Sequence, residues 1–188
     1  MNRDRQGRDV QQKRMAIARM GHPVLRQISG KVTSPADAAI QVLIADMLTT
    51  VFHADGVGLA APQLFAPHRI IILASRPNPR YPQAPEMPPT ALINPELLWV
   101  SEDRETGWEG CLSIPGMRGL VPRNRRVGVR YLTRDGLEKE SEYEGFPARV
   151  LQHEHDHLQG ILFIDRLESL HDLVTEEEYL RRQREQDK

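Results

Sequence analysis

Hydrophobic residues recur at helical spacing in the first third of the chain. The segment 34–37 has the residues of a helix start, with Ser34 as the N-cap and Pro35 at the first helical position. Apolar residues follow at three- and four-residue intervals up to Val51, which predicts one buried face. The helix is expected to end near Asp55-Gly56, because glycine readily adopts the left-handed conformation past a helix end.

Two further helices are predicted in the last third of the chain. The segment 147–159 is typical of a helix, and Gly160 is placed to end it. Thr175 followed by Glu178 forms a capping box, which predicts a final, highly charged helix.

Short apolar runs between the helices predict strands. The run 69–74 is typical of a buried strand, and further strand-like runs cover 91–93 and 97–101. The runs 127–132 and 137–143 flank Asp135-Gly136, a strong hairpin signal. The proline-rich segment 77–89 cannot supply a regular ladder of N–H donors and predicts a long loop.

These patterns predict an α+β fold with antiparallel strands packed around the helix that carries His153. Residues 1–14 are predicted to be a disordered extension, 15–170 a single domain, and 171–188 a charged C-terminal helix and tail.

Charge and hydropathy exclude several classes of protein. Lys and Arg total 25 and Asp and Glu total 26, so the net charge of −1 gives no general basis for nucleic-acid binding, and no specific DNA binding is predicted. The apolar runs are too short to cross a bilayer. Residues 1–14 lack the apolar core of a signal peptide, so we expect a cytoplasmic protein that does not interact with membranes. The basic run 181–184 predicts a solvated helix face, with a transient ribosome contact as the alternative.

The segment 153–157 has the HExxH pattern. Four helical positions advance about 400°, so His153 and His157 lie on one face and can share a metal ion, whereas His155 points away. Glu154 lies beside them, where a carboxylate can accept a proton from water on the metal. A catalytic tetrahedral site needs a third protein ligand, and the candidates are Cys111 or a later carboxylate.

Three segments together resemble the peptide deformylase family: GVGLAAPQ at 56–63, EGCLSIPG at 109–116 and QHEHDHLQG at 152–160. The resemblance extends from about Met15 to Leu167, with the motifs in the family's order. It implies hydrolysis of the N-formyl group from the N-terminal formylmethionine of nascent polypeptides, with release of formate. It also implies one divalent metal ion per chain, usually ferrous iron. Zinc, nickel and cobalt are alternatives that the same ligands accept.

The resemblance also assigns roles to individual residues. It implies that the metal ligands are Cys111, His153 and His157, that Glu154 is the acid–base residue, and that the Gln63 side chain and the Leu112 N–H contact the formyl oxygen. It further implies that Gly58, with Val57 beside it, pairs with the substrate backbone. Val150 is expected to face the pocket for the methionine side chain, and Arg149 to extend its guanidinium to the rim.

Two other classes of protein share parts of this pattern. A metallopeptidase would use HExxH with a downstream third ligand, for which Glu168 and His171 are candidates, but it would leave Cys111 without a role. A non-catalytic protein with a structural metal site would normally need four protein ligands and no neighbouring carboxylate.

Overall fold

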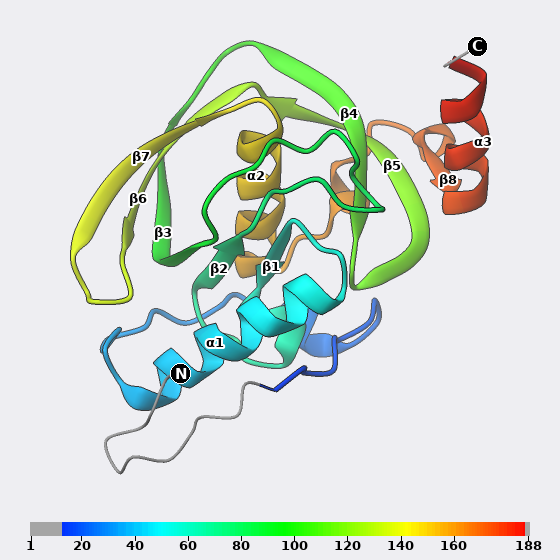
Figure 1. The fold of residues 1–188 in the computed structure, drawn as a ribbon. Coiled ribbons are helices and arrows are strands. Elements are labelled where there is room, and N and C mark those ends of the chain that lie inside the picture. Colours follow the sequence, from blue (N-terminus) through cyan, green and yellow to red (C-terminus); the bar gives the residue numbers. More distant parts are fainter. Residues whose placement is uncertain (1–12, 187–188) are drawn as a thin grey trace.

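The computed structural model describes residues 13–186 and shows an α+β fold (Figure 1). Most of the extension predicted for residues 1–14 lies outside the described residues. Helix α1 lies on one side of a sheet, and helix α2 lies on the other, between this sheet and strands β4 and β5 (Figure 1). The long helices are α1 (Ala38–His53), α2 (Phe146–Leu158) and α3 (Glu176–Gln186). The strands are β1 (Gly58–Ala60), β2 (Ile70–Leu73), β3 (Thr90–Val100), β4 (Arg104–Cys111), β5 (Ile114–Asn124), β6 (Arg126–Leu132), β7 (Glu138–Glu144) and β8 (Leu173–Thr175).

Within residues 13–186 the strands form two antiparallel sheets. A five-stranded sheet has the order β1-β2-β3-β6-β7, and a three-stranded sheet has the order β4-β5-β8. Strand β1 is therefore an edge strand that pairs with β2 on one side only. The predicted hairpin is confirmed, because β6 and β7 pair in continuous register around Gly136, whose φ is 79°.

The first predicted helix begins later than expected and ends close to the expected Asp55-Gly56. Residues 34–37 form a turn, and α1 begins at Ala38 because the Asp37 carboxylate accepts a hydrogen bond of 2.8 Å from the Ala39 N–H. At the other end, Asp55 has the positive φ of 47°. Gly56 instead allows close packing, since a Cβ there would lie 2.8 Å from the Val51 side chain.

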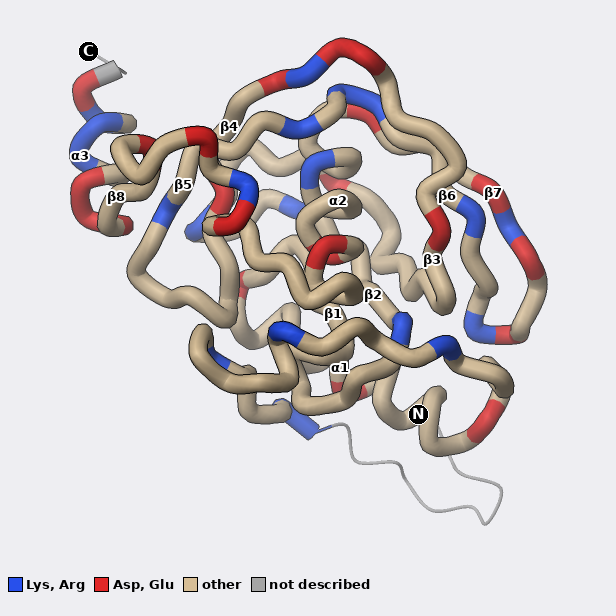
Figure 2. Tube along the Cα trace, turned by 180° about the vertical axis from the view of Figure 1, so that it is seen from behind, with Lys and Arg blue, Asp and Glu red and all other residues tan. Residues whose placement is uncertain are grey.

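The C-terminal segment packs on the smaller sheet. Strand β8 pairs with β5 around Arg118 and Val174, and α3 follows directly. Thr175 caps α3 as predicted, because its hydroxyl accepts a hydrogen bond of 3.2 Å from the Glu178 N–H. Acidic and basic residues are interspersed along this helix (Figure 2).

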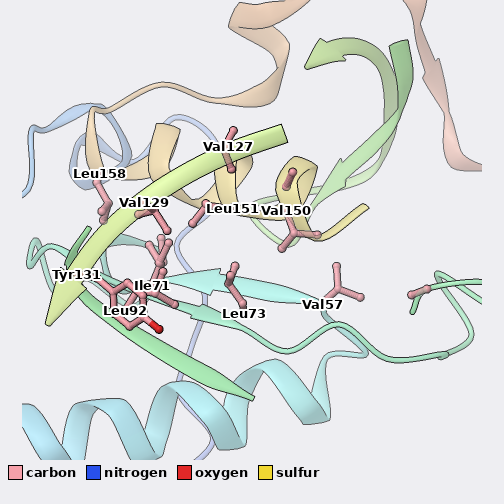
Figure 3. Close-up of a cluster of buried hydrophobic side chains, with 13 residues drawn as sticks. Val57, Ile71, Leu73, Leu92, Val127, Val129, Tyr131, Val150, Leu151 and Leu158 are labelled. Atoms are coloured by element: carbon pink, nitrogen blue, oxygen red, sulfur yellow. The ribbon is translucent and has the colours of Figure 1, made fainter. Parts of the chain in front are cut away.

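The main core lies between α2 and the larger sheet (Figure 3). Strand β2 is buried on both faces: Ile71 and Leu73 pack in the core with α2, whereas Ile70 and Ile72 pack in the core with α1. Because both faces are apolar, β2 appears in the sequence as a continuous hydrophobic run. This burial fixes α2 and β1 against each other, and both carry residues of the site described next. No helix among the described residues is both long and apolar enough to span a membrane.

The pattern of apolar residues did not predict β4 and β5. Cys111 is the last residue of β4, at a tight connection to β5. Glycines in these strands leave room for large side chains: a Cβ on Gly107 would lie 2.9 Å from Arg149, and one on Gly119 would lie 2.8 Å from Phe163. Strands that contain such glycines lack a simple hydrophobic alternation.

Candidate metal centre

Helix α2 and the end of β4 bring three metal-binding side chains together. The ligand atoms of Cys111, His153 and His157 all lie within 4.8 Å of one another, and all three residues are buried. The Cys111 Sγ is 3.3 Å from the His157 Nε2, and the two imidazole centroids are 5.1 Å apart. A thiolate with two imidazoles is a donor set that suits a catalytic transition metal and leaves a coordination position for water.

The electrostatics of the three side chains favour the thiolate. Burial raises the pKa of Cys111, but the neighbouring His157 and His153 outweigh this effect and hold it well below its usual range. Burial lowers the pKa of His153, whereas its hydrogen bonds with Cys111 and Glu109 raise it overall. The sulfur is therefore held in the form that binds metals.

A buried carboxylate behind the ligands orients one imidazole. Glu109 Oε2 accepts a hydrogen bond of 2.9 Å from His153 Nδ1, which leaves the Nε2 lone pair for the metal. Arg123 donates to both oxygens of Glu109, at 2.9 and 3.1 Å, and its other nitrogen contacts Asp156 at 2.6 Å. Burial raises the pKa of Glu109, but hydrogen bonds from His153 and Arg123 lower it overall to about 2. Glu109, Arg123 and Asp156 were not among the residues predicted from the sequence to form the site.

Glu154 lies beside the ligands on α2. Its Oε2 is buried and has no hydrogen-bond partner among the described residues. Burial raises its pKa to about 7, although the nearby imidazoles of His153 and His157 oppose the shift. His155, in contrast, lines a separate cavity with Arg166. A carboxyl group with a pKa near neutrality can both accept and donate a proton.

Gln63 reaches the same centre from the short 3₁₀ helix at Ala61–Leu64. Its Oε1 accepts a hydrogen bond of 2.8 Å from the Ala60 N–H, so the amide orientation is fixed. Its NH₂ group therefore points at Cys111 Sγ, 3.5 Å away, and at Ser113 Oγ, 3.1 Å away. Leu112 follows the ligand directly and lines the same pocket.

A pocket opens from the metal centre along the edge strand β1. Val57, Gly58, Val150 and Arg149 line it, as do Arg80, Tyr81, Trp108 and Phe146. Gly58 permits the close approach of α2, because a Cβ there would lie 2.5 Å from Glu154 Oε1 and 2.7 Å from Val150.

The prediction that the Arg149 guanidinium extends to the solvent rim is wrong. Its side chain is buried and donates to Glu109 Oε1 at 3.1 Å and to the carbonyls of Glu105, Gly107 and Val121. The charge is satisfied inside the protein, so Arg149 ties α2 to β4 and β5.

Comparison with known proteins agrees with this geometry. The family model for polypeptide deformylases matches residues 14–172. The chain belongs to the peptide deformylase family. Peptide deformylase 2 of Nostoc sp. is 52% identical over 165 residues, which cover 88% of this chain and 92% of that protein. Peptide deformylase 1 of Prochlorococcus marinus is 53% identical over 152 residues, covering 80% and 79%.

Solved structures of this family show the same fold. A class I type b peptide deformylase from Acinetobacter baumannii, with Met-Ala-Ser bound, has a TM-score of 0.81 at 44% identity, covering 83% of this chain and 99% of that one. The peptide deformylase from Thermotoga maritima has a TM-score of 0.73 at 39% identity, covering 82% and 99%. The chain is thus a deformylase with a Cys/His/His metal site, a metal-dependent hydrolase.

Proposed function

We propose that the protein removes the formyl group from the N-terminal formylmethionine of nascent polypeptides, and that Glu154 moves the protons. The observation that carries this proposal is the buried Glu154 carboxyl group beside the three ligands, with a pKa of about 7 and an unpartnered oxygen. The Acinetobacter baumannii relative with Met-Ala-Ser bound supports a methionyl peptide as the substrate class.

The three ligands suit one divalent ion, and we propose ferrous iron in the cell. The chemistry such an ion supplies is a Lewis acid that makes water nucleophilic near neutral pH. Zinc, nickel and cobalt also suit the donor set. Metal analysis of protein purified without air tests the identity of the ion. The iron form should lose activity in air faster than the zinc form, and equal losses would contradict the assignment.

The proposed reaction breaks the bond between the formyl carbon and the amine nitrogen. Water attacks the formyl carbon while a Glu154 oxygen takes its proton. Glu154 then gives a proton to the departing amine nitrogen, so the products are formate and a peptide with a free N-terminal methionine. Such transfers typically contribute on the order of 10²- to 10⁴-fold to the rate.

Negative charge grows on the formyl oxygen as water attacks. The Gln63 NH₂ group is fixed in the direction of Cys111 and can donate to that oxygen. We assign the companion donor to the Leu112 N–H, because Leu112 follows the ligand and lines the pocket. Donors placed in this way each contribute about 3–4 kcal/mol to transition-state stabilisation.

The edge strand β1 suits an extended peptide. One side of β1 pairs with β2, and the pocket lies along Val57 and Gly58. A substrate backbone can add to such an edge by main-chain hydrogen bonds. We propose that Val150 contacts the methionine side chain, and that Arg149 shapes the pocket through its fixed position rather than through a mobile charge.

The structure disfavours the metallopeptidase alternative. Its candidate third ligands were Glu168 and His171, which are exposed. Among the described residues, the group that can hold a metal combines the two helix imidazoles with Cys111. A structural zinc site would leave the adjacent Glu154 unexplained.

Formate release from a formyl-Met-Ala-Ser peptide tests the proposal directly. Wild-type protein should release formate, and Glu154→Ala should keep one equivalent of metal while kcat falls about 10²- to 10⁴-fold. Glu154→Asp should also be slow because its carboxylate is withdrawn. Glu177→Ala, a change at an exposed carboxylate, is the control. Near-normal hydrolysis by Glu154→Ala would remove this residue from the mechanism.

The proposed place of action is the cytoplasm, where newly made chains emerge. A transient ribosome contact through the basic run of α3 remains the alternative to a solvated face. Arg181 pairs with Glu178 and Glu185, and Arg182 pairs with Glu178, which favours the solvated face. Cosedimentation of the protein with ribosomes at low and physiological salt would separate these two alternatives.

A further inference from the structure

A buried arginine on β5 connects the pocket to the C-terminal helix. Arg118 is 1% exposed, and its guanidinium donates to the Tyr81 hydroxyl at 2.9 Å. It also donates twice to Glu176 Oε1 of α3, at 2.6 and 3.2 Å. The side chain passes over Gly110, where a Cβ would lie 2.8 Å from its Nη1. One guanidinium therefore joins the segment between β2 and β3 to the start of α3.

Aromatic rings complete this connection. The Arg118 guanidinium carbon lies 5.0 Å from the Tyr81 ring centre and 5.1 Å from that of Tyr179, which belongs to α3. The Tyr179 ring also meets Trp108 edge-on, with centroids 5.3 Å apart. Cation–π contacts of a desolvated guanidinium hold such rings in defined positions. Helix α3 thus contacts β4 through Trp108 and β5 through Arg118.

The rings held in this way belong to the pocket wall. Tyr81 and Trp108 both line the pocket, and Tyr81 packs on Phe146 with centroids 5.4 Å apart. Aromatic rings are favourable partners for a methionine thioether. Tyr81 lies in the proline-rich segment between β2 and β3, outside the sheets. In Figure 1 that segment runs across the front of α2 towards β4.

We propose that Arg118 is a positioning residue that holds Tyr81 in the substrate pocket wall, and that Glu176 of α3 holds Arg118 in turn. The family match ends at residue 172, so α3 would contribute to substrate binding from outside the matched region. A wall fixed before binding loses less conformational freedom when the peptide enters, which lowers KM. This inference rests on the proposed function, because it concerns the same pocket and substrate.

Two substitutions test the connection from its two ends. Tyr81→Phe removes the hydroxyl and keeps the ring, and Glu176→Gln removes the charge that holds the guanidinium. Each should raise KM for formyl-Met-Ala-Ser on the order of fivefold, as expected when one hydrogen bond of Arg118 is lost or weakened. Values of kcat should stay within about twofold and metal content should stay at one equivalent. The double variant should resemble either single variant, because both act through one guanidinium.

Glu178→Gln is the matched control, since Glu178 pairs with Arg181 and Arg182 within α3 and not with Arg118. Unchanged KM in both test variants would overturn the inference. The inference would also be overturned if Glu178→Gln raised KM by as much as the two test variants do. The same holds if the test variants lost kcat and bound metal while KM stayed unchanged. If the wild type releases no formate, the proposed function fails. The same variants are then compared by calorimetric Kd for Met-Ala-Ser, where equal affinities would again overturn the inference.

Discussion

Replacing Glu109 with glutamine should weaken both the fold and the metal centre. Glu109 Oε1 accepts hydrogen bonds from Arg123 and Arg149, and Oε2 accepts from Arg123 and His153. A glutamine oxygen in the place of Oε1 can still accept from Arg123 and Arg149. The NH₂ group then takes the place of Oε2 and faces the N–H donors of Arg123 and His153. His153 would be driven to the tautomer in which Nε2 carries the hydrogen, and that tautomer cannot bind the metal.

The magnitudes follow from the burial of the network. Removing one partner of a buried ion pair typically costs about 3–5 kcal/mol. Because glutamine keeps one acceptor and Arg123 keeps Asp156, we expect the lower end, a loss of about 3 kcal/mol in the free energy of unfolding. Loss of the carboxylate behind a metal-binding histidine typically weakens metal affinity about 10- to 100-fold.

Urea unfolding in the presence of a chelator measures the first effect without a contribution from the metal. Competition with a chromogenic chelator measures the second. Glu105→Gln makes the same chemical change at an exposed position of β4 and should leave both quantities within error. If Glu109→Gln unfolds at the wild-type urea concentration and binds zinc with wild-type affinity, the reasoning about this network is refuted.

Three further predictions follow from the geometry. His153→Ala and His157→Ala should each lose metal and activity together, whereas His155→Ala should keep a full equivalent of metal. Metal analysis of the three variants tests this. The assignment would be contradicted if His155→Ala lost its metal while His157→Ala kept it. Gly58→Ala should lower kcat about 10- to 100-fold, because the new Cβ would displace Glu154. Gly30→Ala is the control and should keep the wild-type kcat, because its Cβ would lie 3.8 Å from the Pro67 carbonyl oxygen. Equal kcat values for the two variants would contradict this prediction. Burial raises the pKa of Tyr143 to about 12, so the neutral phenol stabilises the fold below pH 10. The free energy of unfolding, measured by urea titration, should therefore fall between about pH 10 and 12 in the wild type. Tyr143→Phe should lack this contribution to the fall.

Local sequence determined the elements whose signals lie within a few residues. The HExxH spacing placed His153 and His157 on one face of α2, because the helical period alone decides that relation. Asp135-Gly136 specified the β6–β7 hairpin, and Gly160, with φ of 71°, follows the end of α2 as expected. The family motifs also identified Cys111 as the third ligand.

Only the tertiary structure decided which distant groups meet. The residue pattern placed the N-cap of the first helix at Ser34, but residues 34–37 form a turn and Asp37 caps α1 instead. The sequence predicted that the Arg149 charge lies at the pocket rim. In the structure the guanidinium donates to Glu109, 40 positions away in the chain, and to three backbone carbonyls.

The same holds for Arg118, whose partners lie 37 and 58 positions away in the chain. A strand that contains glycines and arginines shows no hydrophobic period, so β4 and β5 could not be recognised locally. Buried ion pairs connect these strands to α2, as Arg123 does with Asp156 and Glu109 with Arg149. Those contacts exist only once the chain has closed around α2, which is why no local pattern encodes them.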